Sequence, residues 1–522
     1  MSLFKLMDFS VQKESKSNNL IDIIIPGVFD FSIYPFSITS IEGGVVFIGK
    51  NKTGKYLFVL LNKNSTNPLW NKLDGEELAL SKDYNSLNVK KCELTHKNAL
   101  VIKETFDFAK PKLIGLQNSF GMGDRIGLAN PGHIRALKGY QFKPILAQQS
   151  IRELTRTQRT ADEVMDAAIW AVLQEGYKDG FGSDADHLKS TADIDLMMKA
   201  GYTMYTFDPS EYVINEADTV SENELDKIIR TLIWEKLGSK FEDLFSNYAD
   251  KTVNISKNYS LKPTAIELKR ALVKYGNAIA HIKNLYEYIK TTYPTSPFEV
   301  EVSVDETESV TTPFEHFFIA SELKRLKVEF MSLAPRFVGA FEKGIDYKGD
   351  INIFRQEYMK HLAIIKYFGT YKISLHSGSD KFAVYAIVGS FHDAFTHVKT
   401  AGTSYLEAIK VVAISEPDLF REILDFGRGL YETEKISYHV SAVLANVKPA
   451  KEYSNKELVE LFDTNDARQV LHVTFGKVLT EKKADGSYLF KNKILDCLKQ
   501  NEELHYKLLE KHFIKHLEPF KQ

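Results

Sequence analysis

Short apolar segments alternate with longer amphipathic segments over most of the chain after about residue 112. Each apolar segment has the length of a strand and is followed by polar or glycine residues and then by a helical pattern. Eight strands are predicted in this way: Lys112–Leu116, Lys143–Ala147, a short one near Gly180–Gly182, Tyr202–Phe207, Phe298–Val304, Val328–Leu333, Tyr371–Leu375 and Thr396–Thr400. Strands that alternate with helices form parallel sheets, and eight repeats predict a (β/α)8 TIM-like barrel. The active site of such a barrel lies at the carboxyl ends of its strands.

Capping signals mark several of the helix starts between these strands. A serine or threonine followed three residues later by glutamate fits the capping box. Such pairs begin at Thr160, Ser221 and Ser404. Thr312 is followed by a proline at the first helical position, and Asp350 can cap a helix that runs to about Phe368 and stops at Gly369.

The pattern differs at the two ends of the chain, so we predict three regions. Residues 1–110 form a β-rich module, in which Ile21–Ile25, Val45–Ile48 and Tyr56–Leu61 resemble strands of a small antiparallel sheet. Residues 111–410 form the α/β barrel, with a helical insertion near 215–295 that is too long for one crossover. Residues 411–522 are mostly helical.

Composition narrows the class of protein. The 522 residues are 44% hydrophobic and 26% charged, as in an ordinary soluble protein, and 67 basic against 69 acidic residues give a net charge of −2. This balance offers no electrostatic basis for binding nucleic acid or an anionic membrane. The two cysteines, Cys92 and Cys497, cannot build a disulfide framework or a thiolate metal cluster. With no signal peptide and no apolar run near the roughly 20 residues of a membrane span, we expect a cytoplasmic protein; its oligomeric state is not predicted.

The densest group of titratable residues follows the third predicted strand. Asp186 and His187 lie side by side on a turn loosened by Gly180 and Gly182. They could be a helix cap and a surface histidine. Titratable residues at a strand end instead favour a functional pair, with a carboxylate as base and an imidazole as metal ligand.

Other candidates follow the later strands. Glu306 comes after the fifth strand and could be an acid/base group or part of a solvated acidic loop. His376 ends the seventh strand, and Asp346, in a glycine-rich loop, could complete a metal site. His397 lies deeper in the eighth strand and is a weaker ligand candidate than His376. Two cations, Arg336 and Lys399, could hold a substrate carboxylate. A glycine-containing segment, residues 121–126, lacks the third glycine of a dinucleotide fingerprint and is expected to be a loop over the barrel mouth.

Five runs of residues together resemble one family, the tagaturonate/fructuronate epimerases of hexuronate catabolism. The runs are 117–125, 186–189, 332–339, 376–382 and 397–403, and the resemblance covers about residues 110–410. It implies a metal-dependent barrel enzyme that interconverts D-tagaturonate and D-fructuronate. It also implies that Asp186 is the proton acceptor, Glu306 the proton donor and His187 a ligand of a divalent cation (zinc, nickel, cobalt or manganese). Further ligands are expected at His376 and at Asp346, with His397 as the rival of Asp346.

The chemistry of such an epimerase favours a retro-aldol route. The two sugar acids differ at a carbinol carbon β to the ketone, where the C–H bond is not acidified. Removing the proton from the hydroxyl of that carbon and breaking the adjacent C–C bond is easier, and recombination on the other face of the aldehyde gives the epimer. The same residues could serve a class-II-like metal-dependent aldolase or a sugar isomerase, and a non-catalytic sugar-binding protein is a third possibility. Arg336 or Lys399 would hold the substrate carboxylate.

Overall fold

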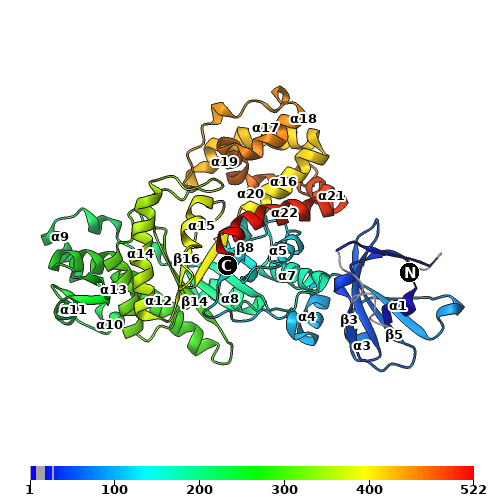
Figure 1. Cartoon of the computed structure of the whole chain (residues 1–522), viewed down its shortest axis with the longest axis horizontal. Coiled ribbons are helices and arrows are strands. Elements are labelled where there is room, and N and C mark those ends of the chain that lie inside the picture. Colours follow the sequence, from blue (N-terminus) through cyan, green and yellow to red (C-terminus); the bar gives the residue numbers. More distant parts are fainter. Residues whose placement is uncertain (1, 8–17, 26–28, 522) are drawn as a thin grey trace.

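The computed structural model describes residues 2–7, 18–25 and 29–521. Its centre is a closed barrel of eight parallel strands, in which the last strand pairs with the first (Figure 1). The strands are β8 (Ser119–Met122), β9 (Lys143–Ser150), β10 (Gly182–Leu188), β11 (Met204–Phe207), β14 (Glu299–Val304), β15 (Ser332–Pro335), β16 (Lys372–Leu375) and β17 (Thr396–Thr400). The predicted (β/α)8 fold is therefore confirmed.

The first predicted strand is wrong. Residues 112–116 do not join the barrel; they cover its amino-terminal end, where Ile114 packs with Ile145 and Met204. The main-chain N–H groups of Ile114 and Gly115 donate to the Glu299 carboxylate at 3.1 and 2.9 Å instead of to a neighbouring strand. The barrel strand is β8, and its last two residues were predicted to belong to the loop of residues 121–126. Gly121 permits it, because a Cβ atom there would lie 2.6 Å from the side chain of Gln148.

The third strand is longer than predicted, and this changes the position of two candidate residues. β10 includes Asp186 and His187, which were expected on a turn after the strand. The pairing of β10 with β11 shifts in register between Ala185 and Leu188, and His187 has a positive φ of 53°. Because this irregularity interrupts the alternation of side chains along a strand, two consecutive residues can approach each other at the barrel mouth. The sixth strand, β15, also begins at Ser332, four residues later than predicted.

Helices surround the barrel in the order that the sequence pattern predicts. They are α5 (Asn130–Ala136), α6 (Ile151–Thr157), α7 (Ala161–Glu175), α8 (Thr191–Ala200), α13 (Pro313–Arg325), α14 (Ile351–Phe368), α15 (Phe382–Val388) and α16 (Thr403–Ser415). The predicted capping boxes at Thr160 and Thr312 are confirmed, as is the Asp350 cap. The predicted capping box at Ser404 is wrong, because Ser404 lies inside α16, which begins at Thr403. The Ser404 hydroxyl instead forms a hydrogen bond with His133 Nε2 at 2.7 Å.

A long insertion separates β11 from β14 and forms the green part on the left of Figure 1. It contains four helices and a two-stranded antiparallel sheet. Its elements are α9 (Glu222–Ile229), α10 (Trp234–Leu237), α11 (Phe241–Tyr248), β12 (Val253–Ser256), β13 (Tyr259–Leu261) and α12 (Ala265–Thr292). Ser221 accepts a hydrogen bond from the backbone N–H of Glu224 and caps α9, but the return bond from the Glu224 side chain that would complete the predicted capping box does not form.

The amino-terminal part of the chain is a seven-stranded antiparallel sheet, blue in Figure 1. Its strands are β1 (Ile21–Ile25), β2 (Phe29–Ile33), β3 (Thr39–Ile41), β4 (Gly44–Lys50), β5 (Lys55–Asn62), β6 (Glu76–Leu78) and β7 (Leu87–Glu93). Among the described residues of this part, the α-helices are α1 (Leu3–Met7), α3 (Leu69–Lys72) and α4 (His96–Thr105). Side chains of this sheet, among them Val46 and Leu57, share one apolar core with the barrel.

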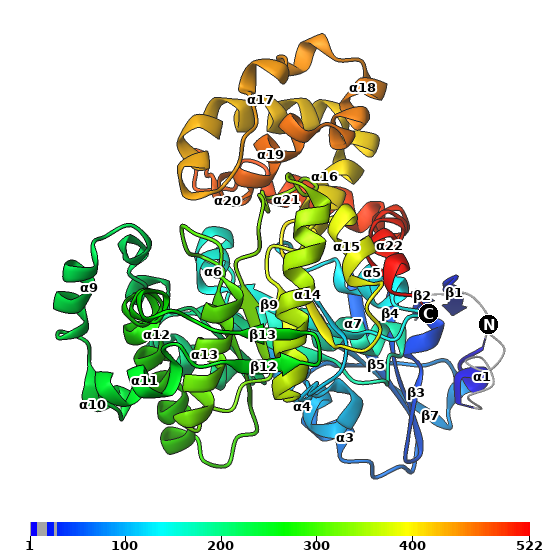
Figure 2. The ribbon, with the colours of Figure 1, turned by 60° about the vertical axis from the view of Figure 1, so that its left-hand side comes forward.

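Helices form the carboxyl-terminal part of the chain above the barrel (Figure 2). They are α17 (Pro417–Glu434), α18 (Asn455–Glu460), α19 (Asn465–Val473), α20 (Phe475–Thr480), α21 (Lys491–Gln500) and α22 (Glu502–Leu517). The last of them, α22, returns to pack against α5 and α16. At its start, the Glu502 carboxylate binds Lys50 and Lys55 of the amino-terminal sheet at 2.8 and 2.7 Å. No described helix has the length and apolar character needed to cross a membrane.

Candidate active site

A network of buried charges fills the carboxyl-terminal half of the barrel. The ammonium group of Lys399 on β17 lies 2.8 Å from each of three carboxylates, those of Asp184, Asp186 and Glu301. Inward-facing residues alternate with outward-facing ones along barrel strands, which explains why residues 184 and 186, and residues 397 and 399, share the interior. Burial raises the pKa of Asp184 to about 6. Burial would do the same to Asp186, but Lys399 and His187 outweigh it and hold the pKa of that carboxyl well below its usual range.

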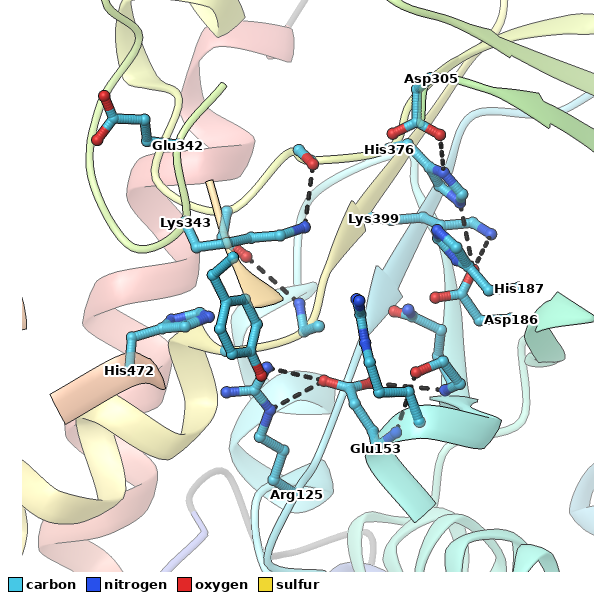
Figure 3. Close-up of a pocket in the computed structure, with 18 of the residues that line it drawn as sticks. Arg125, Glu153, Asp186, His187, Asp305, Glu342, Lys343, His376, Lys399 and His472 are labelled. Atoms are coloured by element: carbon cyan, nitrogen blue, oxygen red, sulfur yellow. Dashed lines mark hydrogen bonds and ion pairs between the residues drawn. The ribbon is translucent and has the colours of Figure 1, made fainter. Parts of the chain in front are cut away.

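Two histidines, His187 and His376, lie next to this network at the mouth of the barrel. The His187 and His376 rings stack with their centroids 4.5 Å apart and their planes 5° from parallel. His376 Nδ1 lies 2.7 Å from Asp305 Oδ1, and its Nε2 lies 3.2 Å from Asp186 Oδ1 (Figure 3). Burial opposes the protonated form of His376, yet the Asp305 carboxylate prevails and raises its pKa to about 9. Asp305 therefore fixes the orientation of this imidazole and leaves Nε2 facing the cavity.

Glu306 lies at the outer edge of the same cluster. Its side chain is 39% exposed, and its Oε1 atom is 3.3 Å from His187 Nε2. The hydrogen bond with His187 lowers the pKa of Glu306 to about 2 despite partial burial. Arg152, at the start of α6, approaches the same carboxylate at 4.0 Å. Asp186 and Glu306 thus lie on opposite sides of His187, one deep in the barrel and one at its rim.

The donor atoms of Asp186, His187 and His376 lie within 4.8 Å of one another. Two imidazoles and a carboxylate are a suitable donor set for zinc, nickel, cobalt or manganese. Two other groups of three potential ligands occur among the described residues: His187 with Asp208 and Glu306, and Asp380 with His512 and His516. The last group also binds the Arg468 guanidinium at 2.6 Å, so a cation already neutralises it.

Neither Asp346 nor His397 joins these groups. The Asp346 carboxylate accepts hydrogen bonds from the backbone N–H groups of Tyr347 and Ala383, at 2.7 and 3.3 Å, and faces a separate hollow near α22. His397 lies fully buried below Lys399, with Nδ1 2.9 Å from the Ser119 hydroxyl, and burial lowers its pKa to about 3. The structure does not bring either expected third ligand beside His187 and His376.

The two cations predicted to hold a carboxylate have other contacts. Lys399 is surrounded by the three acids described above. The Arg336 guanidinium donates to the Thr307 carbonyl oxygen, and its backbone N–H donates to Thr311 Oγ1 at 2.9 Å. It lines an outer hollow that adjoins the main pocket and shares His376 and Asp305 with it.

Several residues of the buried charge network and of the pocket were not singled out from the sequence. Glu301 and Asp184 had a local signal, because charged residues that alternate with apolar ones in a buried strand must face the barrel interior. Lys343, Tyr438 and His472 had none. They line the same pocket but come from a loop and from the helical carboxyl-terminal part, and no periodicity links them to it.

The fold and this pocket together define a TIM-barrel enzyme with carboxylate and imidazole side chains gathered at the carboxyl ends of its strands. The family model for tagaturonate epimerase matches residues 34–520, so the chain belongs to the tagaturonate epimerase family and is an isomerase.

Two known proteins are similar over most of their length. A tagaturonate/fructuronate epimerase from Thermotoga maritima is 43% identical over 432 residues, which cover 82% of this chain and 85% of the relative. The crystal structure of a glycerol complex of fructuronate-tagaturonate epimerase UxaE from Cohnella laeviribosi has a TM-score of 0.87 at 40% identity, covering 94% of this chain and 96% of that one. The native crystal structure of the same enzyme has a TM-score of 0.86 at 40% identity, and the match again covers 94% of this chain and 96% of that one.

Proposed function

We propose that this chain interconverts D-tagaturonate and D-fructuronate, with Asp186 as the proton acceptor, Glu306 as the proton donor and a divalent cation held by His187 and His376. The observation that carries the proposal is the meeting of these four side chains at one mouth of the barrel. The names of the similar enzymes from Thermotoga maritima and Cohnella laeviribosi support the choice of substrates.

The reaction begins with the hydroxyl on the carbon to be inverted. Asp186 is ionised, because Lys399 and His187 hold its pKa low, so it can accept the hydroxyl proton. The electron pair left on oxygen forms the aldehyde C=O as the adjacent C–C bond breaks, and the other fragment becomes an enediolate. Rotation of the aldehyde presents its other face. The C–C bond then re-forms, and the new alkoxide takes a proton from Glu306, so no atom is gained or lost.

A cation held by the two imidazoles would supply a Lewis acid for the ketone oxygen and would require both imidazoles to be neutral. With His187 neutral, the hydrogen bond that holds the pKa of Glu306 near 2 loses its charge. Glu306 lies at the rim with its side chain 39% exposed, so it can exchange protons with solvent between turnovers. Lys399 remains beside Asp186 and keeps that carboxylate ionised.

The test is turnover by chelator-stripped protein supplied with D-tagaturonate alone or with one added ion, either zinc, nickel, cobalt or manganese, and with products identified by NMR. We expect D-fructuronate to appear only with an added ion. Asp186→Asn and Glu306→Gln should each reduce turnover at least about 100-fold. Glu211→Gln, on the exposed loop after β11, is the matched control and should be unaffected.

Other products would identify the alternatives. Release of two fragments would indicate a class-II-like aldolase, and movement of the carbonyl would indicate a sugar isomerase. Incorporation of solvent deuterium at the inverted carbon would contradict the retro-aldol route, because that route never breaks the C–H bond there. Absence of turnover with every ion would refute the assignment of substrate.

A further inference from the structure

The wall of the pocket opposite the acids and histidines carries positive charge and unpaired hydrogen-bonding groups. Lys343, Arg125 and His472 line this wall, facing Asp186, His187 and His376 across the same pocket (Figure 3). Lys343 comes from the loop after β15, Arg125 from the segment after β8 and His472 from α19.

Lys343 is a cation without a described counter-ion. Its ammonium group donates to the Ser377 hydroxyl at 3.0 Å, and no carboxylate among the described residues lies within ion-pair distance of it. Lys399, by contrast, is already paired with three carboxylates. An anion entering the pocket would therefore meet a free positive charge at Lys343 and repulsion near Lys399.

His472 and Arg125 add hydrogen-bonding capacity that the protein leaves unused. Both ring nitrogens of His472 are buried without a partner among the described residues, and the residue is only 1% exposed. Arg125 binds Glu153 through Nε and Nη2 and lies 3.7 Å over the Phe475 ring, but its buried Nη1 has no hydrogen-bond partner in the described part of the chain. Buried polar groups without partners are costly, so their presence at a cavity indicates a ligand that pairs with them; the neutral His472 ring can donate one N–H to it.

The carboxyl-terminal helices hold this wall in place. Gln469 donates to the Glu342 carboxylate at 2.8 Å and to the Lys343 carbonyl oxygen at 3.3 Å, and Arg468 donates to the Gly344 carbonyl oxygen at 2.7 Å. Gly402 leaves room for the His472 ring, because a Cβ atom there would lie 1.9 Å from Cε1. The loop with Lys343 and the ring of His472 are thus fixed relative to each other by one region of the chain.

We propose that Lys343, Arg125 Nη1 and His472 form a carboxylate-binding subsite that selects hexuronates over uncharged ketohexoses. The inference rests on the proposed function, since it places the acid end of the substrate on this wall and the reacting carbons beside Asp186. It also gives the carboxyl-terminal helices a role in substrate selection, and it moves carboxylate binding away from Arg336 and Lys399.

The test is equilibrium binding, which does not depend on catalysis. D-galactonate is an open-chain six-carbon acid, and galactitol is its uncharged counterpart. Calorimetry with the purified full chain should show galactonate binding at least about tenfold tighter than galactitol. Lys343→Met should weaken galactonate binding about 10- to 100-fold, the range expected for loss of a charge-assisted hydrogen bond, and leave galactitol binding unchanged. Lys343→Arg should restore part of the loss.

Two further variants sharpen the result. Lys499→Met removes an exposed lysine of α21 and is the matched control, expected to bind galactonate as the wild type does. His472→Leu removes both ring nitrogens and should weaken galactonate binding selectively, by a smaller factor than Lys343→Met.

Unchanged galactonate binding by Lys343→Met, an equal loss for both ligands, or no binding of galactonate to the wild type would overturn the subsite. Failure of the proposed function is a separate result, because it would appear as absent turnover of D-tagaturonate in a wild type that still discriminates between galactonate and galactitol.

Discussion

Asp305 acts through His376 in the geometry described above. Asp305→Asn would remove the charge that fixes the imidazole and raises its pKa, while the amide keeps nearly the same size. We expect a 10- to 100-fold loss of metal affinity or turnover, as is typical when the carboxylate partner of a ligating histidine is removed. Measurement of kcat as a function of metal concentration would detect it. Glu308→Gln, three residues further along the chain and exposed, should behave as the wild type; equal losses in both variants would contradict the role of Asp305.

Lys399 balances three buried carboxylates, so its replacement should affect both stability and activity. Lys399→Met leaves Asp184, Asp186 and Glu301 without their shared cation. Breaking a buried ion pair from one side costs about 3–5 kcal/mol. Thermal unfolding should therefore show a clear decrease in Tm, and adding Asp184→Asn should recover part of it. A Tm equal to that of the wild type would mean that the three acids share protons instead of relying on the lysine.

The candidate side chains could be predicted from the sequence wherever strand position alone determines them. Asp186, His187, Glu306 and His376 end or follow strands, and the structure brings them together. Their roles stay predictions. Asp346 sits in a loop, and its direction depends on the backbone N–H groups of Tyr347 and Ala383, which no local pattern specifies.

The contact between the loop after β17 and α19 depends on one glycine. In Gly402→Ala the new methyl carbon would overlap the His472 ring, which is buried and cannot move away without displacing α19. We expect a loss of about 1–3 kcal/mol in stability, the usual cost of overpacking, together with weaker galactonate binding. Gly429→Ala, in α17 with open space around its Cα, is the matched control and should be neutral or stabilising by up to ~1 kcal/mol. Similar behaviour of the two variants in thermal unfolding would contradict the contact.

Strands and helices were predicted well where periodicity and caps agree, and poorly where tertiary contacts override them. Residues 112–116 have the apolar character of a strand, but the N–H groups of Ile114 and Gly115 donate to Glu299, which lies 185 positions after Ile114 in the sequence. β8 contains Gly121, which disfavours a strand in isolation and is acceptable only because Gln148 packs against it. Whether either segment forms a barrel strand therefore depends on residues that are distant in sequence.

The amino-terminal sheet is joined to the carboxyl-terminal helix through Glu502. Its carboxylate binds Lys50, Lys55 and the Tyr34 hydroxyl. Burial opposes the charge, but Lys55 and Lys50 prevail and hold the pKa of Glu502 well below its usual range. A depressed folded-state pKa contributes stability above the unfolded value of about 4.3, and this contribution is lost as the pH falls below it.

Glu502→Gln should therefore destabilise the protein near neutral pH, by about 2–4 kcal/mol, and by less in acid. Thermal unfolding of both proteins between about pH 7 and pH 3.5 would measure the difference, which should begin to shrink below about pH 4.3 because the unfolded wild-type carboxylate takes up a proton there. Glu503→Gln, whose side chain is 56% exposed, offers a neighbouring control. A difference in Tm that stays constant down to the lowest pH would show that the link is not electrostatic.

The cover formed by residues 112–116 has a consequence for isotope labelling. Ile114, Ile145 and Met204 pack beside the Glu299 carboxylate at the amino-terminal end of the barrel, and the pocket that reaches Lys399 and Asp186 lies at the opposite end. A substrate seated in the pocket closes that end too. A proton passed to Asp186 is then held in a chamber with no second exit, and its exchange with bulk water has to wait for the product to leave. Hydroxyl protons exchange with bulk water on release, so the label has to be read at carbon: a pocket closed at both ends should keep solvent deuterium out of the enediolate and hence out of the C–H bonds of the product.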